Sequence, residues 1–282
     1  MNPYRSAVAR FAANRFALAA ALVVAALALA ALGAPILAPA DPIAQPDPVG
    51  LQNQPPSADY PLGTDRFSRD VLSRLLYGAR VSLGIGAAAA LLAVTIGAGV
   101  GLAAGLASPV VDQVLMRGVD VALALPRVFL ILLVLALWEN APAGTVIVLI
   151  AATGWFQTSR VIRALVLRLR ETEFVQAARA LGAGRRELVL RHVLPHIAPA
   201  VVVSATIDVG NIILLESGLS YLGLGVRPPS PSWGNMIMEG KDQLLTAPWV
   251  AAAPGIALLV TVLACNLAGD GLQDAFDPKG AR

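Results

Sequence analysis

The chain has 282 residues, of which 57% are hydrophobic and only 14% are charged. A soluble domain carries about 25% charged residues, so this composition excludes an ordinary soluble globular protein and indicates a polytopic membrane protein. The formal net charge is +3, and the single cysteine, Cys265, excludes a disulfide within the chain and a cysteine-based metal cluster. We expect no metal site, and the basic residues give no reason to expect nucleic-acid binding.

Six apolar runs are long enough to cross a bilayer, which takes about 20 helical residues. They cover residues 16–37, 81–106, 118–138, 143–165, 200–222 and 249–269. None shows the alternation that is typical of a β-barrel strand, so the sequence predicts an all-α protein with six transmembrane helices. The first run ends in APILAPA, like a secretory signal, but it exceeds the about 7–15 apolar residues of such a signal, so we expect a retained anchor.

Basic residues in the connecting segments predict which side of the membrane each segment faces. Six lie in one set of segments: Arg66, Arg69, Arg74, Arg80, Arg227 and Lys241. Fourteen lie in the opposite set: Arg5, Arg10, Arg15, Arg117, Arg160, Arg163, Arg168, Arg170, Arg179, Arg185, Arg186, Arg191, Lys279 and Arg282. The second set includes both termini, which are therefore predicted to be cytoplasmic.

The segment before the second run has two parts. Residues 38–59 are rich in Pro, Asp and Gln, which predicts an extended outer loop. Residues 61–80 place apolar and charged residues on opposite sides at helical spacing, which predicts an amphipathic helix along the outer interface, with Asp65 as N-cap and Gly78 as its end. The chain thus divides into an anchor helix with its loop (1–60), an interfacial helix (61–80) and a transmembrane domain (81–282).

Small and charged residues within the second and third spans indicate helix contacts. Gly97, Gly101 and Gly105 are four apart and allow another helix to approach closely, either within this chain or from a partner. In the third span, Asp120 and Arg127 are seven apart on one face. Because a charge in a span is costly, Arg127 needs a partner or a path along which its side chain reaches water.

The fifth span carries polar residues in an apolar run. Ser204, Asp208 and Asn211 form one helical stripe, and Glu216 lies further along on a different face. Polar and ionisable groups in a span are candidates for a translocation path. Hydrogen bonding between helices explains them equally well, and the sequence leaves both explanations open.

Residues 171–195, between the fourth and fifth spans, form a predicted cytoplasmic elbow. Residues 171–181 predict a short helix, Gly182 and Gly184 a sharp change of direction, and residues 185–193 a second helix closed by Pro195. The expected apolar face of the second helix comprises Val189, Leu190, Val193 and Leu194. Such an elbow can present small side chains to a neighbouring protein, although an ordinary basic connector would have the same charge pattern.

The elbow sequence QAARALG, followed by HVLP, resembles the EAA signature of ABC-importer permeases, E-A-A-x3-G-x9-I-x-L-P. Gln176 stands in place of the Glu, which puts any role for a carboxylate there in doubt, and His192 stands where Ile is usual. The resemblance implies a role in coupling to an ATPase for Gln176, Ala177, Ala178, Gly182, Leu194 and Pro195.

Three further stretches resemble the C-type subunit of the dipeptide/oligopeptide/nickel permease family: PLGTDRFSRDVLSRLLYGARVSL, ESGLSYLGLGVRPPSPSWGNMI and NLAGDGLQDAFDPKGAR. The resemblance implies a type I importer fold in a bacterial or archaeal inner membrane. It also implies four partners: a homologous B-type permease, two ABC ATPase subunits and an extracytoplasmic binding protein. The cargo would be peptides or related small solutes, with glutathione, nickel chelates and haem-like ligands also open.

Other functions fit these residues less well. The chain lacks a G-x-x-x-x-G-K-[ST] phosphate loop, so we expect ATP and Mg²⁺ at partner subunits and no cofactor on this chain. An intramembrane serine protease needs facing Ser and His within the membrane, but His192 and His196 lie in the elbow. A secondary transporter working without ATPase subunits usually shows inverted repeats or broken helices, and no clear repeat is present.

Overall fold

The protein is described by a computed structural model over residues 3–138 and 142–277, which contain helices and loops but no β-strand. The first half comprises α1 (Pro3–Ala13), α2 (Arg15–Leu32), α3 (Ala34–Leu37), α4 (Val71–Leu106), α5 (Pro109–Ala124) and α6 (Arg127–Leu137). The second half comprises α7 (Ala143–Arg170), α8 (Glu173–Ala180), α9 (Arg185–Glu187), the π-helix η1 (Leu188–Val193), α10 (Leu194–Tyr221), α11 (Trp233–Gly240), the 3₁₀-helix η2 (Lys241–Gln243) and α12 (Trp249–Phe276).

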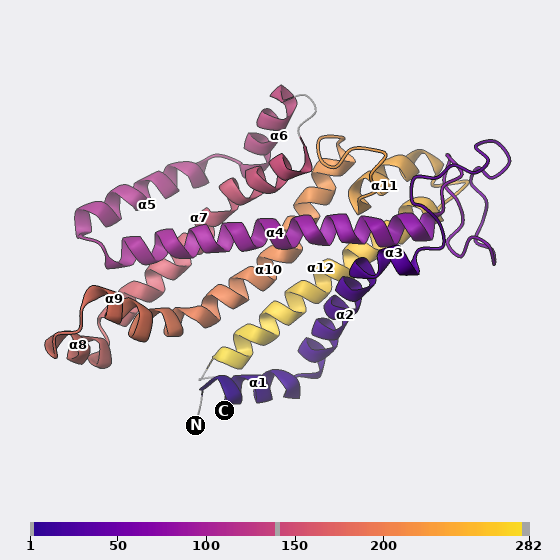
Figure 1. Cartoon of the computed structure of the whole chain (residues 1–282). Coiled ribbons are helices and arrows are strands. Elements are labelled where there is room, and N and C mark those ends of the chain that lie inside the picture. Colours follow the sequence, from indigo (N-terminus) through magenta and orange to yellow (C-terminus); the bar gives the residue numbers. More distant parts are fainter. Residues whose placement is uncertain (1–2, 139–141, 278–282) are drawn as a thin grey trace.

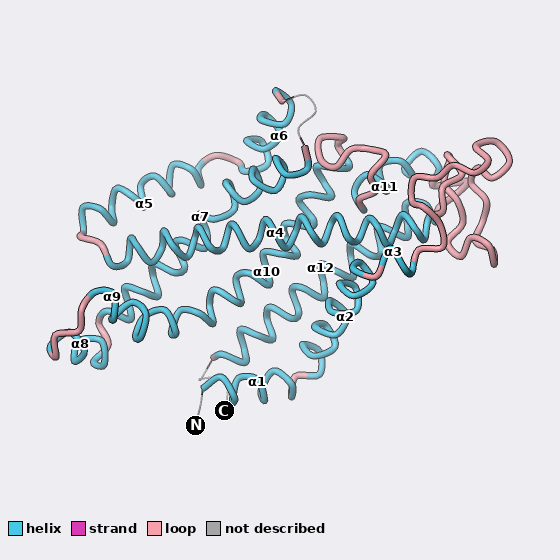
Figure 2. Tube along the Cα trace, viewed as in Figure 1, coloured by secondary structure: helices cyan, strands magenta, loops and turns pink. Residues whose placement is uncertain are grey.

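Long helices run along the body of the molecule, with α4 through its middle (Figure 1). Five of them, α2, α4, α7, α10 and α12, are long and apolar enough to cross a membrane. The short α8 and α9 lie at one end, and most of the loop structure, including residues 38–70, gathers at the other (Figure 2). This separation places the elbow and the extended loop at opposite ends of the spans.

The third predicted span is broken into two helices. Together α5 and α6 are apolar enough to cross a membrane, but they are bent by 75° relative to each other. Leu125, at the break, has an extended backbone with φ −89° and ψ 131°. Pro126 explains the break, because proline disfavours a helical conformation in the preceding residue and has no N–H to continue the ladder.

The glycine row of α4 packs against α7 within this chain, which resolves the alternative that the sequence left open. A Cβ atom on Gly101 would lie 2.5 Å from the carbonyl oxygen of Ser159, and one on Gly97 would lie 2.7 Å from that of Trp155. The two backbones therefore approach more closely than any side chain at these positions would allow.

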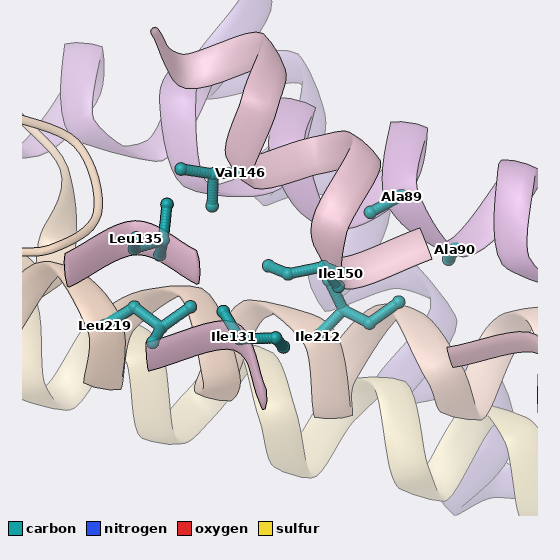
Figure 3. Close-up of a cluster of buried hydrophobic side chains, with 8 residues drawn as sticks. All are labelled: Ala89, Ala90, Ile131, Leu135, Val146, Ile150, Ile212 and Leu219. Atoms are coloured by element: carbon teal, nitrogen blue, oxygen red, sulfur yellow. The ribbon is translucent and has the colours of Figure 1, made fainter. Parts of the chain in front are cut away.

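A buried apolar cluster joins four helices in the middle of the protein (Figure 3). Ile150 of α7 lies between the small side chains of Ala89 and Ala90 on α4 and the branched side chains of Ile131 on α6 and Ile212 on α10 (Figure 3). The cluster is completed by Leu135, Val146 and Leu219. It holds the broken third span against the other helices.

The predicted amphipathic helix over residues 61–80 is wrong in its extent. Residues 61–70 form turns, and α4 begins at Val71 with Asp70 as the N-cap, whose carboxylate accepts a hydrogen bond from the Ser73 N–H at 2.7 Å. Gly78 does not end the helix, because it lies inside α4, where a Cβ would approach the Trp233 ring to 3.3 Å. The residues counted as one surface helix are thus turns followed by the first turns of a long helix.

Candidate coupling elbow and translocation path

The elbow begins with α8 and reverses direction at Gly182. Gly182 has φ +86°, a left-handed conformation that favours glycine. Its N–H donates to the Arg179 carbonyl at 2.9 Å, and the Ala183 N–H donates to the Ala178 carbonyl at 3.0 Å. These two bonds form the Schellman motif that closes a helix C-terminus. The predicted turn at Gly182 is therefore confirmed, with its hydrogen bonds.

The elbow presents the small residues of the signature to its surroundings. Gln176 and Ala177 are exposed, Ala178 is half-buried, and a Cβ on Gly182 would have no atom within 4 Å. Leu181 is 89% exposed, which the sequence analysis missed although it directly precedes Gly182 in the motif. A large apolar side chain that projects from a small-residue surface is suited to contact with another protein.

One buried side chain of α8 ties this surface to the spans. Val175 is fully buried in a cluster with Ile162 and Val166 of α7. Leu188, Val193 and Ile197 complete the cluster from the other side of the elbow. The Phe174 ring stacks on His196 of α10 with 4.9 Å between ring centroids. Packed side chains therefore connect α8 to α7 and α10.

The second half of the elbow differs from the prediction in two ways. Pro195 does not close a helix, because it lies in the first turn of α10, and the helical path runs unbroken from Arg185 to Tyr221. The buried face comprises Leu188 and Val193, whereas Leu190 and Leu194 are 50% and 42% exposed.

The π-helix explains why the buried face of this segment differs from the predicted one. Residues Leu188–Val193 form i→i+5 hydrogen bonds, so positions five apart, such as 188 and 193, fall on the same side. The sequence prediction assumed an α-helix, in which positions three and four apart share a face. Leu194 is therefore exposed at the start of α10, beside the buried Val193.

The polar stripe of the fifth span lies on α10. Ser204 and Asp208 are half-buried and Asn211 is exposed. The Asp208 carboxylate interacts with the guanidinium of Arg127 on α6 and with the hydroxyl of Thr158 on α7. Asn211 lines a groove of about 380 Å³ together with Val128 of α6 and otherwise apolar residues of α10. Asp208 and Asn211 therefore lie on a surface shared by α6, α7 and α10.

Glu216 is separated from this stripe. It is fully buried, and its carboxylate accepts hydrogen bonds from Ser220 at 2.6 Å and from Ser82 of α4 at 3.1 Å. Ser82 also accepts a hydrogen bond from the Trp233 N–H at 3.2 Å. In this conformation Glu216 joins α4 to α10 and, through Ser82, to α11.

The chain matches two families of known membrane-transport proteins. The family described as binding-protein-dependent transport system inner membrane component matches residues 71–281. The N-terminal transmembrane domain of oligopeptide transport permease C matches residues 2–56. The chain belongs to the binding-protein-dependent permease family. It is a multi-pass bacterial membrane protein and a C-type permease subunit of an ABC importer, so the secondary-transporter alternative is set aside despite the broken third span.

Relatives of this permease match most of its length. A Brucella suis protein that carries the name peptide permease is 44% identical over 229 residues, which are 80% of this chain and 76% of that protein. A second Brucella suis protein, named as a peptide transport system permease, is 40% identical over 235 residues, or 82% and 77% of the two chains. The dipeptide transport system permease protein DppC of Alkalihalophilus pseudofirmus is 35% identical over 283 residues, or 99% and 91%.

The permease also contains a buried ionic cluster at the loop end, which the sequence analysis missed. Arg69 donates to Asp65 and to Glu239, each at 2.6 Å, and Arg74 donates to Glu239 at 2.8 Å. All four side chains are at most 6% exposed. The cluster joins the turns before α4 and the first turn of α4 to α11. Glu239 is 165 positions from Arg74 and 170 positions from Arg69, and no local pattern predicts contacts over such separations.

Proposed function

We propose that this permease is half of a peptide importer, paired with a homologous B-type permease and driven by two ABC ATPase subunits. An extracytoplasmic binding protein would deliver di- or oligopeptides, or related small solutes, to the loop end of the spans. The basic asymmetry supports cytoplasmic termini and a cytoplasmic elbow. The names of the three relatives support the peptide cargo, since each is named as a peptide or dipeptide permease. We expect the chain to catalyse no reaction itself, with ATP and Mg²⁺ held by the ATPase subunits.

The packing of the elbow is the observation that supports a role in coupling the ATPase subunits to the spans. An exposed surface around Gln176, Ala177 and Gly182 is backed by the fully buried Val175, which packs on α7. An ATPase seated on this surface would contact the backbone closely, because the side chains there are short. Its movement would reach the spans through Val175 rather than being absorbed in a flexible loop.

The experiment compares Gly182→Asp with Gly184→Asp in the assembled transporter. A Cβ added to either glycine would meet open space, so the same charge is introduced at each position without a clash. Only Gly182 has a left-handed backbone, where a Cβ costs about 1–2 kcal/mol. Gly184 caps α9 in an extended conformation, a position at which Asp is favoured.

We expect Gly182→Asp to insert normally into the membrane but to lose ATPase copurification or substrate-stimulated ATP hydrolysis, whereas Gly184→Asp should be affected much less. The measurements are the membrane level of each variant, the amount of copurified ATPase and the substrate-stimulated hydrolysis rate. Wild-type association and coupling in Gly182→Asp would show that the elbow is only a connector.

A further inference from the structure

A hollow lies beside the break in the third span. It has a volume of about 270 Å³ and is lined by residues of α5, α6 and α7, including Arg127, Thr153 and Gln157. Whole-ligand pockets begin at about 300 Å³, so this hollow suits one end of a solute rather than an entire molecule. The 75° bend between α5 and α6 places Arg127, the first residue of α6, at its wall.

The Arg127 guanidinium is only partly used by the protein. Its Nε donates to the Thr153 hydroxyl at 3.2 Å, and its Nη2 donates to the Ile150 carbonyl at 2.8 Å. Over residues 3–138 and 142–277, its Nη1 makes no hydrogen bond. The two bonds to α7 hold the guanidinium in place and leave part of its fork of five N–H donors available.

The charge of Arg127 is incompletely balanced. Asp208 of α10 interacts with it electrostatically but makes no direct ion pair with it among the described side chains. The nearby basic residues of α7 have their own partners, because Arg160 pairs with Asp120 and Arg163 pairs with Asp112. A positive charge in a span is costly unless it serves a polar path or finds a counter-charge.

We infer that this hollow binds a carboxylate of the transported solute through the Nη1 group of Arg127. Arginine bonds to carboxylates are charge-assisted and stronger than neutral ones, and the anion would supply the balance that Asp208 provides only in part. This inference rests on the proposed function, because a peptide carries a free carboxylate at its C-terminus. Asp208 would then set the strength of binding, since its negative charge opposes an approaching anion.

The first test measures whether the hollow attracts anions, in the absence of any transported solute. A Gln157→Cys variant places a thiol at an exposed lining position, and Cys265, the other cysteine of this chain, is buried. In the assembled transporter in nanodiscs, an anionic methanethiosulfonate reagent should label Cys at position 157 at least about tenfold faster than a cationic one, after correction for their rates with a free thiol. Adding Arg127→Gln should remove this preference, and adding Asp208→Asn should increase it.

The second test adds a solute. Millimolar dialanine should slow labelling at position 157 several-fold, while its C-terminal amide, which lacks the carboxylate, should not. Arg127→Gln should abolish the protection, and Arg127→Lys, which keeps the charge, should retain part of it. Copurification of all subunits with each variant checks that the transporter still assembles.

Three results would overturn the inference: no labelling at position 157, no dependence of the reagent preference on Arg127, or equal protection by dialanine and its amide. The proposed function has a separate measurement, ATP-dependent uptake of dialanine by the wild-type transporter with its binding protein. Failure of uptake alone would contradict the peptide cargo, whereas uptake without carboxylate-dependent protection would contradict only the role of Arg127.

Discussion

The buried ionic cluster at the loop end predicts a large loss of stability when Glu239 becomes Gln. Oε2 of Glu239 accepts from Nη2 of Arg69 at 2.6 Å and from Nη2 of Arg74 at 2.8 Å. With Asp65, the cluster holds two positive and two negative groups. Removing the charge of Glu239 leaves two buried guanidinium groups with one carboxylate.

The expected cost follows from burial. Because these side chains are at most 6% exposed, water screens the uncompensated charge poorly. Removing one partner of a buried ion pair costs about 3–5 kcal/mol. If each kcal/mol shifts the melting temperature by about 2–4 °C, as in soluble domains of about 150–250 residues, the permease should melt roughly 6–20 °C lower.

The assay is thermal unfolding of the detergent-solubilised permease, followed by loss of the monodisperse peak in size-exclusion chromatography. The matched control is Asp242→Asn, which removes the same charge from an exposed residue three positions away. It should melt within about 1–2 °C of the wild type, since exposed substitutions change stability little.

The double variant Arg74→Met with Glu239→Gln should lose less stability than the sum of the losses in the two single variants, because the two residues share a hydrogen bond. Equal melting temperatures for Glu239→Gln and Asp242→Asn would refute the assignment of this cluster as a stabilising junction.

Three further predictions concern packing, hydrogen bonding and topology. Gly101→Leu should prevent folding or assembly, because its Cβ would lie 2.5 Å from a backbone oxygen of α7. The control Gly99→Leu, with open space around its Cβ, should assemble normally. Equal yields of the two variants would contradict the α4–α7 contact. Glu216→Ala should lower the melting temperature by removing the acceptor shared by Ser82 and Ser220, at a cost of about 1–3 kcal/mol, and an unchanged melting temperature would exclude a structural role. A membrane-impermeant thiol reagent applied to whole cells should label Val49→Cys and not Arg185→Cys, and external labelling at position 185 would refute a cytoplasmic elbow.

The sequence by itself predicted the helical class, the apolar spans and the turn at Gly182. Apolar length determines where a helix can cross a bilayer, because every backbone polar group in lipid must be satisfied within the helix. A glycine between two short helical patterns predicts a reversal for a similarly local reason, since a left-handed backbone is unfavourable for other residues. These features depend on neighbours in the chain, which a sequence shows directly.

Features that depend on the identity of a distant partner were not predictable in this way. The glycine row of α4 indicated close packing, but only the structure shows that α7 is the neighbour. Arg69 and Arg74 looked like the polar side of a surface helix because their partner, Glu239, is far away in the sequence. Their burial is decided by long-range ion pairing, to which helical periodicity is insensitive.

The remaining corrections arise where helix geometry departs from 3.6 residues per turn or from a straight axis. The π-helix at Leu188–Val193 changes which apolar residues are buried, and the bend after Leu125 sets Arg127 beside a hollow instead of within a continuous span. The sequence determined that Arg127 is a costly charge in need of a partner, because its cost depends on residue type and an apolar setting. Only the tertiary structure decided that α7 takes two of its hydrogen bonds and that Asp208 lies near enough to interact, because both depend on how separate helices pack together.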